Sequence, residues 1–506
     1  MRLTERLVTG GRRGAAIAAA LLLTAAAPAT PAVMIDSGPL VGARGSDGRA
    51  MFRGVPFAAA PVGRRRWRAP APARRWTAPR DASRSAPACP QVDYGWNHAA
   101  AARQSEDCLF LDVATPEPAP RRALPVMVWI HGGGNRAGGA AGTVDSPIVA
   151  RGVVLVSIQY RLGALGFLSH PALSREQAGA SGNYALMDQV AALRWVRRNI
   201  ARFGGDPARV TIVGESAGAQ DVGLLQLAPD AKGLFAGAIE ESGTAGFGLP
   251  PRSLAQNQLL GLAVARAAGV RAGATAAQLR SVPAAALVKA SEAATMPGLD
   301  DASYIWLQAI VDGRVLRETP AATLARGGGV HVPLIVGSNA RELTMSASLD
   351  RLIDSGFGHN AAAARRLYGL GSGTMPPPDS RLGDLATHVA DDITFRCPAA
   401  VVAAAGARAG TPVWRYEFDY QPAGAAPVTH GSELAYVFGD GMRQPGAPDL
   451  AAAWVRFAAT GDPNGPGLPR WPRYTIASPN HLAFTSTGPQ SKVGLRDPIC
   501  RLRSRP

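Results

Sequence analysis

The stretch that decides the fold is Val210-Thr211-Ile212-Val213-Gly214-Glu215-Ser216-Ala217-Gly218. Its first four residues are apolar or β-branched and predict a buried strand. The last five form a Gly-x-Ser-x-Gly pattern, which directly after a strand is typical of a nucleophile elbow. Both glycines fit such a turn, because it leaves little room for a Cβ on either side of the serine. Ser216 is therefore the candidate nucleophile, and the residues after it are expected to form a helix.

A glycine-rich turn lies upstream of this stretch. The apolar run 126–130 is followed by His131-Gly132-Gly133-Gly134. Attack of a hydroxyl on an ester carbonyl creates an oxyanion, which backbone N–H groups must already face. We predict that Gly133, Gly134 and Ala217 donate these N–H groups. The alternative interpretation is a flexible turn without a catalytic role.

A base and an orienting acid should follow Ser216 in the order acid, then histidine. His430 lies in an expected loop and is the preferred base among the late histidines, His359, His388, His430 and His481. Glu342 is the preferred acid, because it follows the apolar run 332–337 and so lies near the carboxyl end of a strand, where open α/β sheets build their sites. Asp312 and Asp350 remain the competing carboxylates.

Strand and helix patterns alternate along the chain. Strand-like runs occur near 126–130, 153–158, 210–213, 236–240, 332–336, 412–418 and 482–485. The clearest helix is expected from Asn183 to Phe203, where six apolar residues form one stripe and Gly204-Gly205 ends it. This alternation predicts an α/β fold with a mostly parallel, doubly wound sheet covered by helices on both faces. Residues 33–506 are expected to form a single domain, in which the Ala-rich segment 249–307 is a helical insertion that caps the site.

The sequence resembles the type-B carboxylesterases, the cholinesterase-like branch of the α/β-hydrolases, over nearly its whole length. Matching segments beyond the elbow are Arg53-Gly54-Val55-Pro56-Phe57-Ala58, Ser105-Glu106-Asp107-Cys108-Leu109-Phe110-Leu111-Asp112, Tyr160-Arg161-Leu162-Gly163, Phe203-Gly204-Gly205-Asp206-Pro207, Glu241-Ser242-Gly243 and Thr460-Gly461-Asp462-Pro463-Asn464. So many ordered matches make the resemblance specific.

This resemblance implies a serine hydrolase that cleaves small carboxylic esters without a cofactor or metal. It assigns the nucleophile to Ser216, the acid to Glu342 and the base to His430, and the oxyanion donors to Gly133, Gly134 and Ala217. An amidase, a lactonase or a specialised natural-product ester hydrolase on the same machinery remains an alternative. A non-catalytic binding relative would normally lack one of the three catalytic side chains.

Three positions depart from the family pattern. Asp221 replaces a common Ser, Arg341 a common Asp, and Gln159 a usual Asn. A carboxylate near the base favours the charged imidazole, so Asp221 and Arg341 are expected to affect the pH profile.

The aromatic residues Trp96, Phe247, Trp306 and Phe357 are candidates for lining the pocket, although core packing explains each equally well.

Four cysteines allow three disulfide pairings. Proximity and the family pattern favour Cys89–Cys108, which leaves Cys397–Cys500. A metal site is the alternative, but the cysteines have no Cys-x-x-Cys spacing.

The first 32 residues have the features of a signal peptide: an arginine-bearing start, an apolar stretch from Gly14 to Ala27, and small residues after it. We therefore expect export to the periplasm or the extracellular space, and no integral membrane association, since no later stretch is long and apolar enough to span a membrane. The pair Arg12-Arg13 leaves the export route open. The net charge is +16, but the arginines are mostly scattered, so nucleic-acid binding is not expected.

Overall fold

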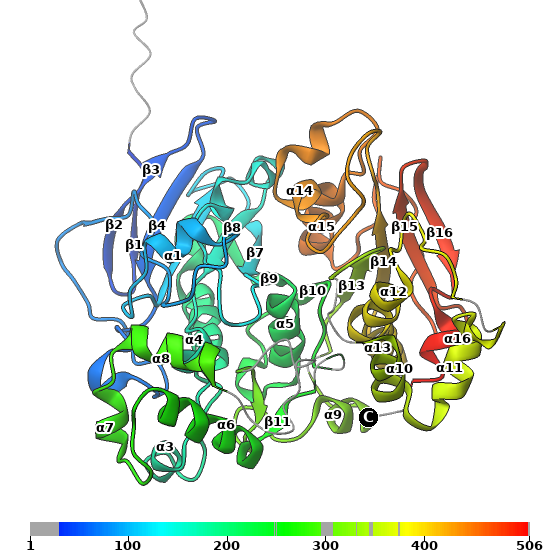
Figure 1. Cartoon of the computed structure of the whole chain (residues 1–506). Helices are drawn as coiled ribbons and strands as arrows, with labels where there is room; N and C mark the ends of the chain where they lie inside the picture. The colour runs from blue at the N-terminus through cyan, green and yellow to red at the C-terminus, as the bar shows by residue number, and fades with distance from the viewer. Residues whose placement is uncertain are drawn as a thin grey trace, which may run out of the picture.

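A twisted β-sheet runs through the middle of the molecule (Figure 1). The computed structural model describes residues 30–246, 248, 250–294, 307–329, 331–343, 348–372 and 375–503. Within these residues the sheet has eleven strands, in the order β16-β15-β14-β13-β10-β9-β7-β8-β6-β4-β3. Neighbouring strands from β8 to β15 are parallel, and the strands at the two ends are antiparallel. The bounds are β3 (Ala43–Arg44), β4 (Ala50–Pro56), β6 (Phe110–Thr115), β7 (Leu124–Ile130), β8 (Val154–Ile158), β9 (Gly205–Glu215), β10 (Gly237–Glu241), β13 (Leu334–Asn339), β14 (Val413–Asp419), β15 (Asn480–Thr485) and β16 (Gly488–Val493).

The prediction of a mostly parallel sheet covered on both faces is confirmed. All seven expected strand-like runs overlap strands of this sheet, and β8, β10 and β13 are buried along their whole length. Such strands read as continuous apolar runs because helices cover both faces. The end strand β16 is mostly exposed and polar, so it carries no run of this kind.

Alternate residues of the central strands face two separate cores. Val128 and Ile212 pack in the core that contains residues of α4 (Tyr184–Asn199), α5 (Ala217–Leu227) and α13 (Cys397–Arg408). Trp129 and Val213, their neighbours in the chain, pack in the second core with residues of α15 (Leu450–Thr460). The sheet is therefore the middle layer of a three-layer molecule.

The expected helix at 183–203 is present. Helix α4 covers most of it, a 3₁₀ turn at Ile200–Phe203 completes it, and Gly204 ends it with a φ of 81°. A left-handed residue at this position is a common helix stop.

The insertion after β10 is mostly helical in its described part, as expected, and begins with the short strand β11 (Arg252–Ser253). It contains α6 (Leu254–Ala267), α7 (Ala276–Arg280) and α8 (Ala284–Ala293). Ser253 with Gln256, and Thr275 with Gln278, form capping boxes at the starts of α6 and α7. Residues 295–306, which complete the predicted cap, lie outside the described residues.

The remaining elements surround this framework: β1 (Ala32–Ile35), β2 (Gly38–Val41), β5 (Arg80–Asp81), β11 (Arg252–Ser253), β12 (Ile310–Val311), α1 (His98–Ala102), α2 (Gly163–Phe167), α3 (Pro171–Arg175), α9 (Pro320–Ala325), α10 (Leu349–Phe357), α11 (Ala361–Leu367), α12 (Leu385–Asp391), α14 (Leu434–Val437) and α16 (Asp497–Cys500). Disulfides join Cys89 to Cys108 and Cys397 to Cys500, the pairing that proximity and the resemblance favour. Within the described ranges, none of the helices has the length and apolar character needed to cross a membrane.

Candidate active site

Ser216 occupies the tight turn between β9 and α5, as the Gly-x-Ser-x-Gly pattern predicts. Its φ of 59° and ψ of −125° are unfavourable for any residue other than glycine, and such a backbone conformation costs about 1–3 kcal/mol. A Cβ on Gly218 would lie 2.1 Å from the carbonyl oxygen of Ile130, and one on Gly214 would lie 2.4 Å from the backbone of Gly218. The two glycines are therefore required by close backbone packing, which holds Ser216 in its strained conformation.

The glycine-rich turn after β7 lies against Ser216. A Cβ on Gly132 would be 3.0 Å from the Cβ of Ser216, and Gly133 and Gly134 have φ values of 101° and 63°. Neither Gly133 nor Gly134 donates its N–H to a partner among the residues that the structure describes. Ala217 is the first residue of α5, where N–H groups have no intrahelical acceptor. The structure thus brings the three predicted oxyanion donors close to the predicted nucleophile.

His430 and Glu342 also meet at this place. Nδ1 of His430 lies 2.7 Å from Oε2 of Glu342. On the other side of the ring, Nε2 is 3.0 Å from Oε1 of Glu215, the residue before Ser216. Neither atom of this second contact forms a hydrogen bond within the described part of the chain. The contact is therefore an ion pair without the geometry of a hydrogen bond. Nε2, the nitrogen that faces the elbow, is therefore not committed to another hydrogen bond.

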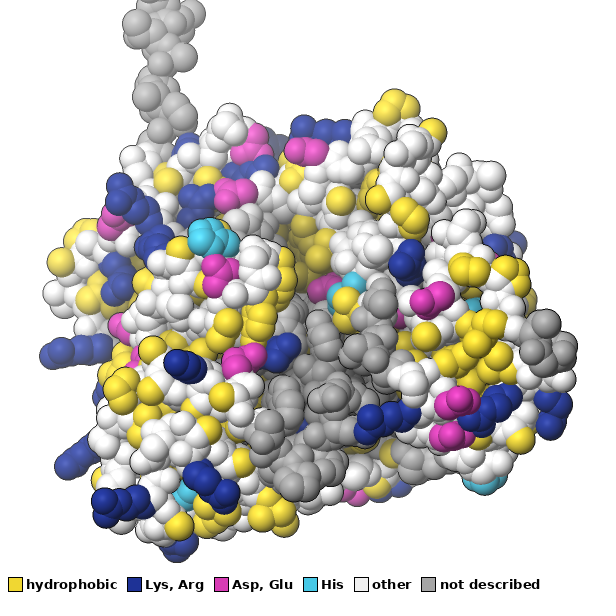
Figure 2. Space-filling model, viewed as in Figure 1, with side chains coloured by type: hydrophobic (Ala, Val, Ile, Leu, Met, Phe, Trp, Pro, Cys, Tyr) yellow, Lys and Arg dark blue, Asp and Glu magenta, His cyan; other side chains and the backbone are white. Residues whose placement is uncertain are grey.

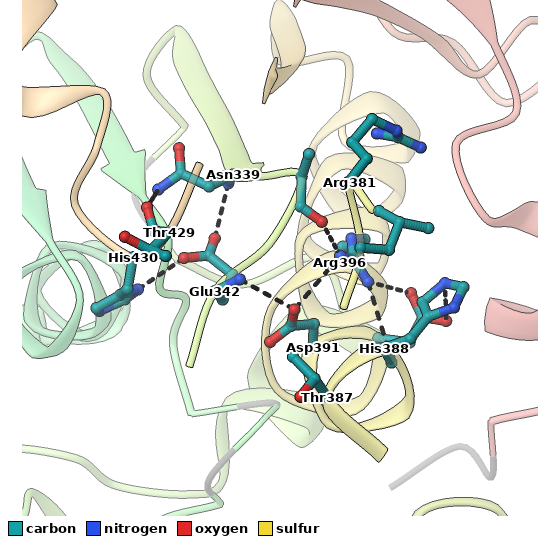
Figure 3. A network of polar contacts seen from close by, with 12 residues as sticks. Asn339, Glu342, Arg381, Thr387, His388, Asp391, Arg396, Thr429 and His430 are labelled. Atoms are coloured by element: carbon teal, nitrogen blue, oxygen red, sulfur yellow. Dashed lines mark hydrogen bonds and ion pairs between the residues drawn. The ribbon is translucent and has the colours of Figure 1, made fainter. Parts of the chain in front are cut away.

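Glu342 is held in place by hydrogen bonds from two sides (Figure 3). Its Oε1 accepts hydrogen bonds from the Ser242 hydroxyl and the Asn339 N–H, both at 2.7 Å. Its own N–H donates to Oδ2 of Asp391 at 2.9 Å. The side chain is completely buried, so these bonds fix the carboxylate that orients His430.

A buried arginine connects the acid loop to the helices behind it. Arg396 donates to the carbonyl oxygen of Ala340 and, at 2.9 Å, to Asp392, and it lies 3.5 Å from Asp391 (Figure 3). Arg396 closes a π-helical turn, Asp392–Arg396, between α12 and α13. Such turns occur often at functional sites, and here the turn brings the guanidinium to the loop of Glu342.

The electrostatics of the site centre on His430. Burial opposes the charged ring, but the carboxylates of Glu215 and Glu342 outweigh it and raise the pKa of His430. Burial also raises the pKa of Glu215 and brings that of Glu433 to about 8. The carboxylates of this buried cluster therefore favour the charged form of the His430 imidazole, while burial favours the neutral forms of Glu215 and Glu433.

A cavity of about 820 Å³ opens onto Ser216 and His430. Figure 2 shows a hollow in this face of the molecule, with a histidine side chain in it. Of the predicted pocket aromatics, Trp96 lines the cavity and is 65% exposed, whereas Phe357 packs in a separate core around α10 and α12. Phe247 and Trp306 lie outside the described residues.

The competing candidates lie elsewhere. Asp350 forms an exposed ion pair with Arg365, and Asp312 binds the backbone N–H groups of residues 314–316. His388 lies beside Asp392, and His481 lies in β15. None of these side chains is among the described residues that line the cavity.

The three departures from the family pattern have different surroundings. Asp221 is fully buried below the glycine turn, where Asn135 and Gln189 donate hydrogen bonds to it. Arg341 approaches Gly383 at the start of α12, and among the described residues it does not line the cavity. Gln159 lines the cavity and donates to the Pro87 carbonyl.

Several residues of the site were not predicted from the sequence. Glu215, Ser242, Asn339, Glu433 and Asp391 contact the candidate triad or its immediate partners. Glu215 lies inside the Gly-x-Ser-x-Gly pattern and Ser242 inside Glu241-Ser242-Gly243, but neither pattern indicates that these side chains contact His430 or Glu342. Within the described ranges, no group of three or more His, Cys, Asp and Glu side chains is arranged to hold a metal ion.

The sheet and the strand–serine–helix turn define an α/β-hydrolase fold. The family model that matches the chain is that of the carboxylesterase family, over residues 29–365 and 376–502. The chain belongs to this family, and it is a carboxylic ester hydrolase of type B.

Relatives of known activity agree with this assignment. The fumonisin B1 esterase of Sphingopyxis macrogoltabida is 36% identical over 84% of this chain and 81% of its own length. The para-nitrobenzyl esterase of Bacillus subtilis (strain 168) is 34% identical over 84% of this chain and 88% of its own length. Among solved structures, a PNB esterase matches 94% of this chain with a TM-score of 0.80 and 30% identity, and covers 99% of that chain. The carboxylesterase EST55 of Geobacillus stearothermophilus matches 94% of this chain with a TM-score of 0.76 and 32% identity, and 99% of its own chain is covered.

Proposed function

We propose that this enzyme cleaves carboxylic esters through an acyl-enzyme on Ser216, with His430 as the base and Glu342 as the orienting acid. The observation that carries the proposal is the 2.7 Å contact between His430 and Glu342 beside the strained turn of Ser216. These three side chains come from loops that are far apart in the chain. Ser216 and His430 line one cavity, and Glu342 contacts His430 from behind it, which supports a catalytic role more strongly than any one motif does.

In the proposed mechanism, His430 takes the proton of Ser216 as its oxygen attacks the ester carbonyl. Glu342 holds Nδ1–H, so that Nε2 is the basic nitrogen, and stabilises the imidazolium that forms. The N–H groups of Gly133, Gly134 and Ala217 stabilise the oxyanion; losing one such donor costs about 10²–10³ in rate. His430 then protonates the leaving alcohol, and water repeats the cycle on the acyl-enzyme.

We also propose that the enzyme acts outside the cytoplasm, as a single catalytic domain of residues 33–506 after removal of a signal peptide of residues 1–32. The pattern of the first 32 residues supports export, and two disulfides suit an oxidising compartment. Determining the N-terminus of the exported protein tests this proposal.

Labelling with a fluorophosphonate, followed by peptide mapping, tests the catalytic assignment without knowledge of the substrate. We expect one adduct per chain, on Ser216. The variant Ser216→Ala should fold normally, bind no label and lose several powers of ten in kcat on a short-chain ester. A labelled residue other than Ser216, or full turnover by Ser216→Ala, would disprove the assignment.

A further inference from the structure

Two arginines line the cavity that opens onto Ser216. Arg136 follows the glycine turn by two residues, and Arg103 follows helix α1. Among the described lining residues, Glu215 is the one carboxylate, and it faces His430. The described lining of the cavity thus has one carboxylate, Glu215, beside the base His430, and two guanidinium groups, those of Arg103 and Arg136, elsewhere.

Arg136 lies close to the predicted oxyanion donors. Its N–H donates to the carbonyl oxygen of Gly133 at 3.2 Å, and a Cβ on Gly134 would lie 3.7 Å from its Nε. The guanidinium lies 4.9 Å from the ring centre of Tyr94, and one of its nitrogens is 3.4 Å from Glu292 of α8. That distance exceeds the 2.7–2.9 Å that is usual for a charge-assisted hydrogen bond. The contact between Arg136 and Glu292 is therefore longer than a well-formed charge-assisted hydrogen bond.

Arg103 has a fixed backbone and an exposed side chain. Its carbonyl oxygen accepts the N–H of Ala88 at 2.9 Å, and its N–H donates to Ala100 at 3.3 Å, inside the loop that Cys89–Cys108 closes. Its side chain makes no hydrogen bond or ion pair in the part of the chain that the structure describes. An exposed guanidinium at a cavity wall can bind an incoming anion without first breaking an internal contact.

The rest of the wall is small and partly polar. Its small side chains include Ala86, Ala88, Ala99, Ala100, Ala140 and Ala141, and Asn97 and Gln159 add amide groups. This lining leaves room for a substrate larger than a short acyl chain. A guanidinium binds a carboxylate through two parallel N–H groups, whereas Glu215 repels an anion from the base.

We propose that this cavity takes esters that carry a carboxylate of their own, such as half-esters of dicarboxylic acids, and that Arg136 and Arg103 bind that carboxylate. The inference rests on the proposed function and adds the class of substrate. The ester group lies at Ser216, and the free carboxylate points away from Glu215 toward the arginines.

The test compares two esters of equal chain length, monoethyl adipate and ethyl hexanoate, by titration of the acid released at constant pH. We expect a higher kcat/KM for monoethyl adipate, and a ratio of the two values that falls as salt is added, because salt screens exposed charges. In the double variant Arg103→Gln/Arg136→Gln the ratio should fall by about tenfold. Arg266→Gln, which removes an exposed charge from α6, is the matched control and should keep the ratio of the wild type. Glu292→Gln should raise the ratio, since it removes a carboxylate that competes with the substrate for Arg136.

An unchanged ratio in the double variant, or equal loss of the ratio in Arg266→Gln, would overturn this inference while ester hydrolysis itself stands. Hydrolysis of neither ester, together with an unlabelled Ser216, would instead overturn the proposed function on which the inference rests.

Discussion

Glu215 adjoins the candidate nucleophile in sequence, yet its carboxylate faces the candidate base. The 3.0 Å contact with Nε2 of His430 places a negative charge on the side of the ring from which Ser216 must be activated. Burial disfavours a charged imidazole, and the carboxylates of Glu215 and Glu342 reverse that effect and raise the pKa of His430. The residue between Gly214 and Ser216 therefore affects the pH range in which the base is available.

The variant Glu215→Gln should shift the acidic limb of the pH profile to lower pH. His430 must be neutral to accept a proton, so kcat/KM rises as pH increases through the pKa of His430. Removing the negative charge of Glu215 lowers this pKa and extends activity to more acidic conditions. The measurement is kcat/KM against pH on a neutral ester, with Glu215→Asp as the variant that keeps the charge. An acidic limb at the same pH in Glu215→Gln would mean that Glu215 is already protonated there.

Asp221 joins three elements of the fold. It lies in α5, and it accepts hydrogen bonds from Gln189 of α4 at 2.5 Å and from Asn135, after the glycine turn, at 3.2 Å. The amide oxygens of Asn135 and Gln189 have no hydrogen-bond partner among the described residues. Burial raises the pKa of Asp221 to about 7, although both hydrogen bonds favour a lower value. The carboxylate thus supports the oxyanion turn at a cost that depends on pH.

The variant Asp221→Asn should be more stable than the wild type at pH 8, with a smaller difference at pH 5. The folded protein holds a proton on Asp221 up to about pH 7, whereas the unfolded chain releases it near pH 4. The free energy of unfolding therefore falls as pH rises between these two pKa values. The total loss is about 1.4 kcal/mol for each unit by which the folded-state pKa exceeds the unfolded-state pKa. The neutral amide of Asp221→Asn avoids this loss. If the side-chain amide of Asn135 or Gln189 flips, its unpaired oxygen can accept the N–H groups of the new amide.

Urea unfolding at pH 5 and pH 8 measures this difference, which should reach a few kcal/mol. The variant Asp221→Ser also removes the charge, but its smaller side chain leaves a void in the core. Comparing it with Asp221→Asn separates the effect of charge from that of packing. A difference between Asp221→Asn and the wild type that is equal at the two pH values would contradict the prediction.

Sequence patterns predicted the elements whose signals are local. Strands β7 and β13 and the second half of β9 are buried and contain apolar runs, and Gly204 marks the end of the helical region that begins with α4. The contact of Glu215 with His430 could not be predicted in the same way, because it joins residues that are far apart in the chain and that only the tertiary structure brings together. The Arg396–Ala340 bond depends on a π-helical turn, which has no periodic signal. Local signals therefore located the candidate nucleophile, whereas its surroundings required the tertiary structure.

At the scale of the whole molecule, the disulfide Cys397–Cys500 connects the C-terminal segment to the helices behind the candidate acid. Cys397 begins α13 directly after Arg396, and Cys500 ends α16. Arg496 adds an ion pair of 2.6 Å with Asp392, in the same π-helical turn. The last described residues are thus fixed at two points to the region that supports Glu342.

The double variant Cys397→Ser/Cys500→Ser should unfold several degrees below the wild type. A disulfide stabilises a protein mainly by restricting the unfolded chain, and a closed loop of about 100 residues is worth about 4.7 kcal/mol in the chain-entropy model. The two cysteines are 103 positions apart, whereas Cys89 and Cys108 are 19 apart, a loop worth about 3 kcal/mol. We therefore expect a larger loss from Cys397→Ser/Cys500→Ser than from Cys89→Ser/Cys108→Ser, measured by thermal unfolding at one heating rate. Equal losses would indicate that local packing at each bridge, rather than the length of chain it closes, sets the stability that the disulfide provides.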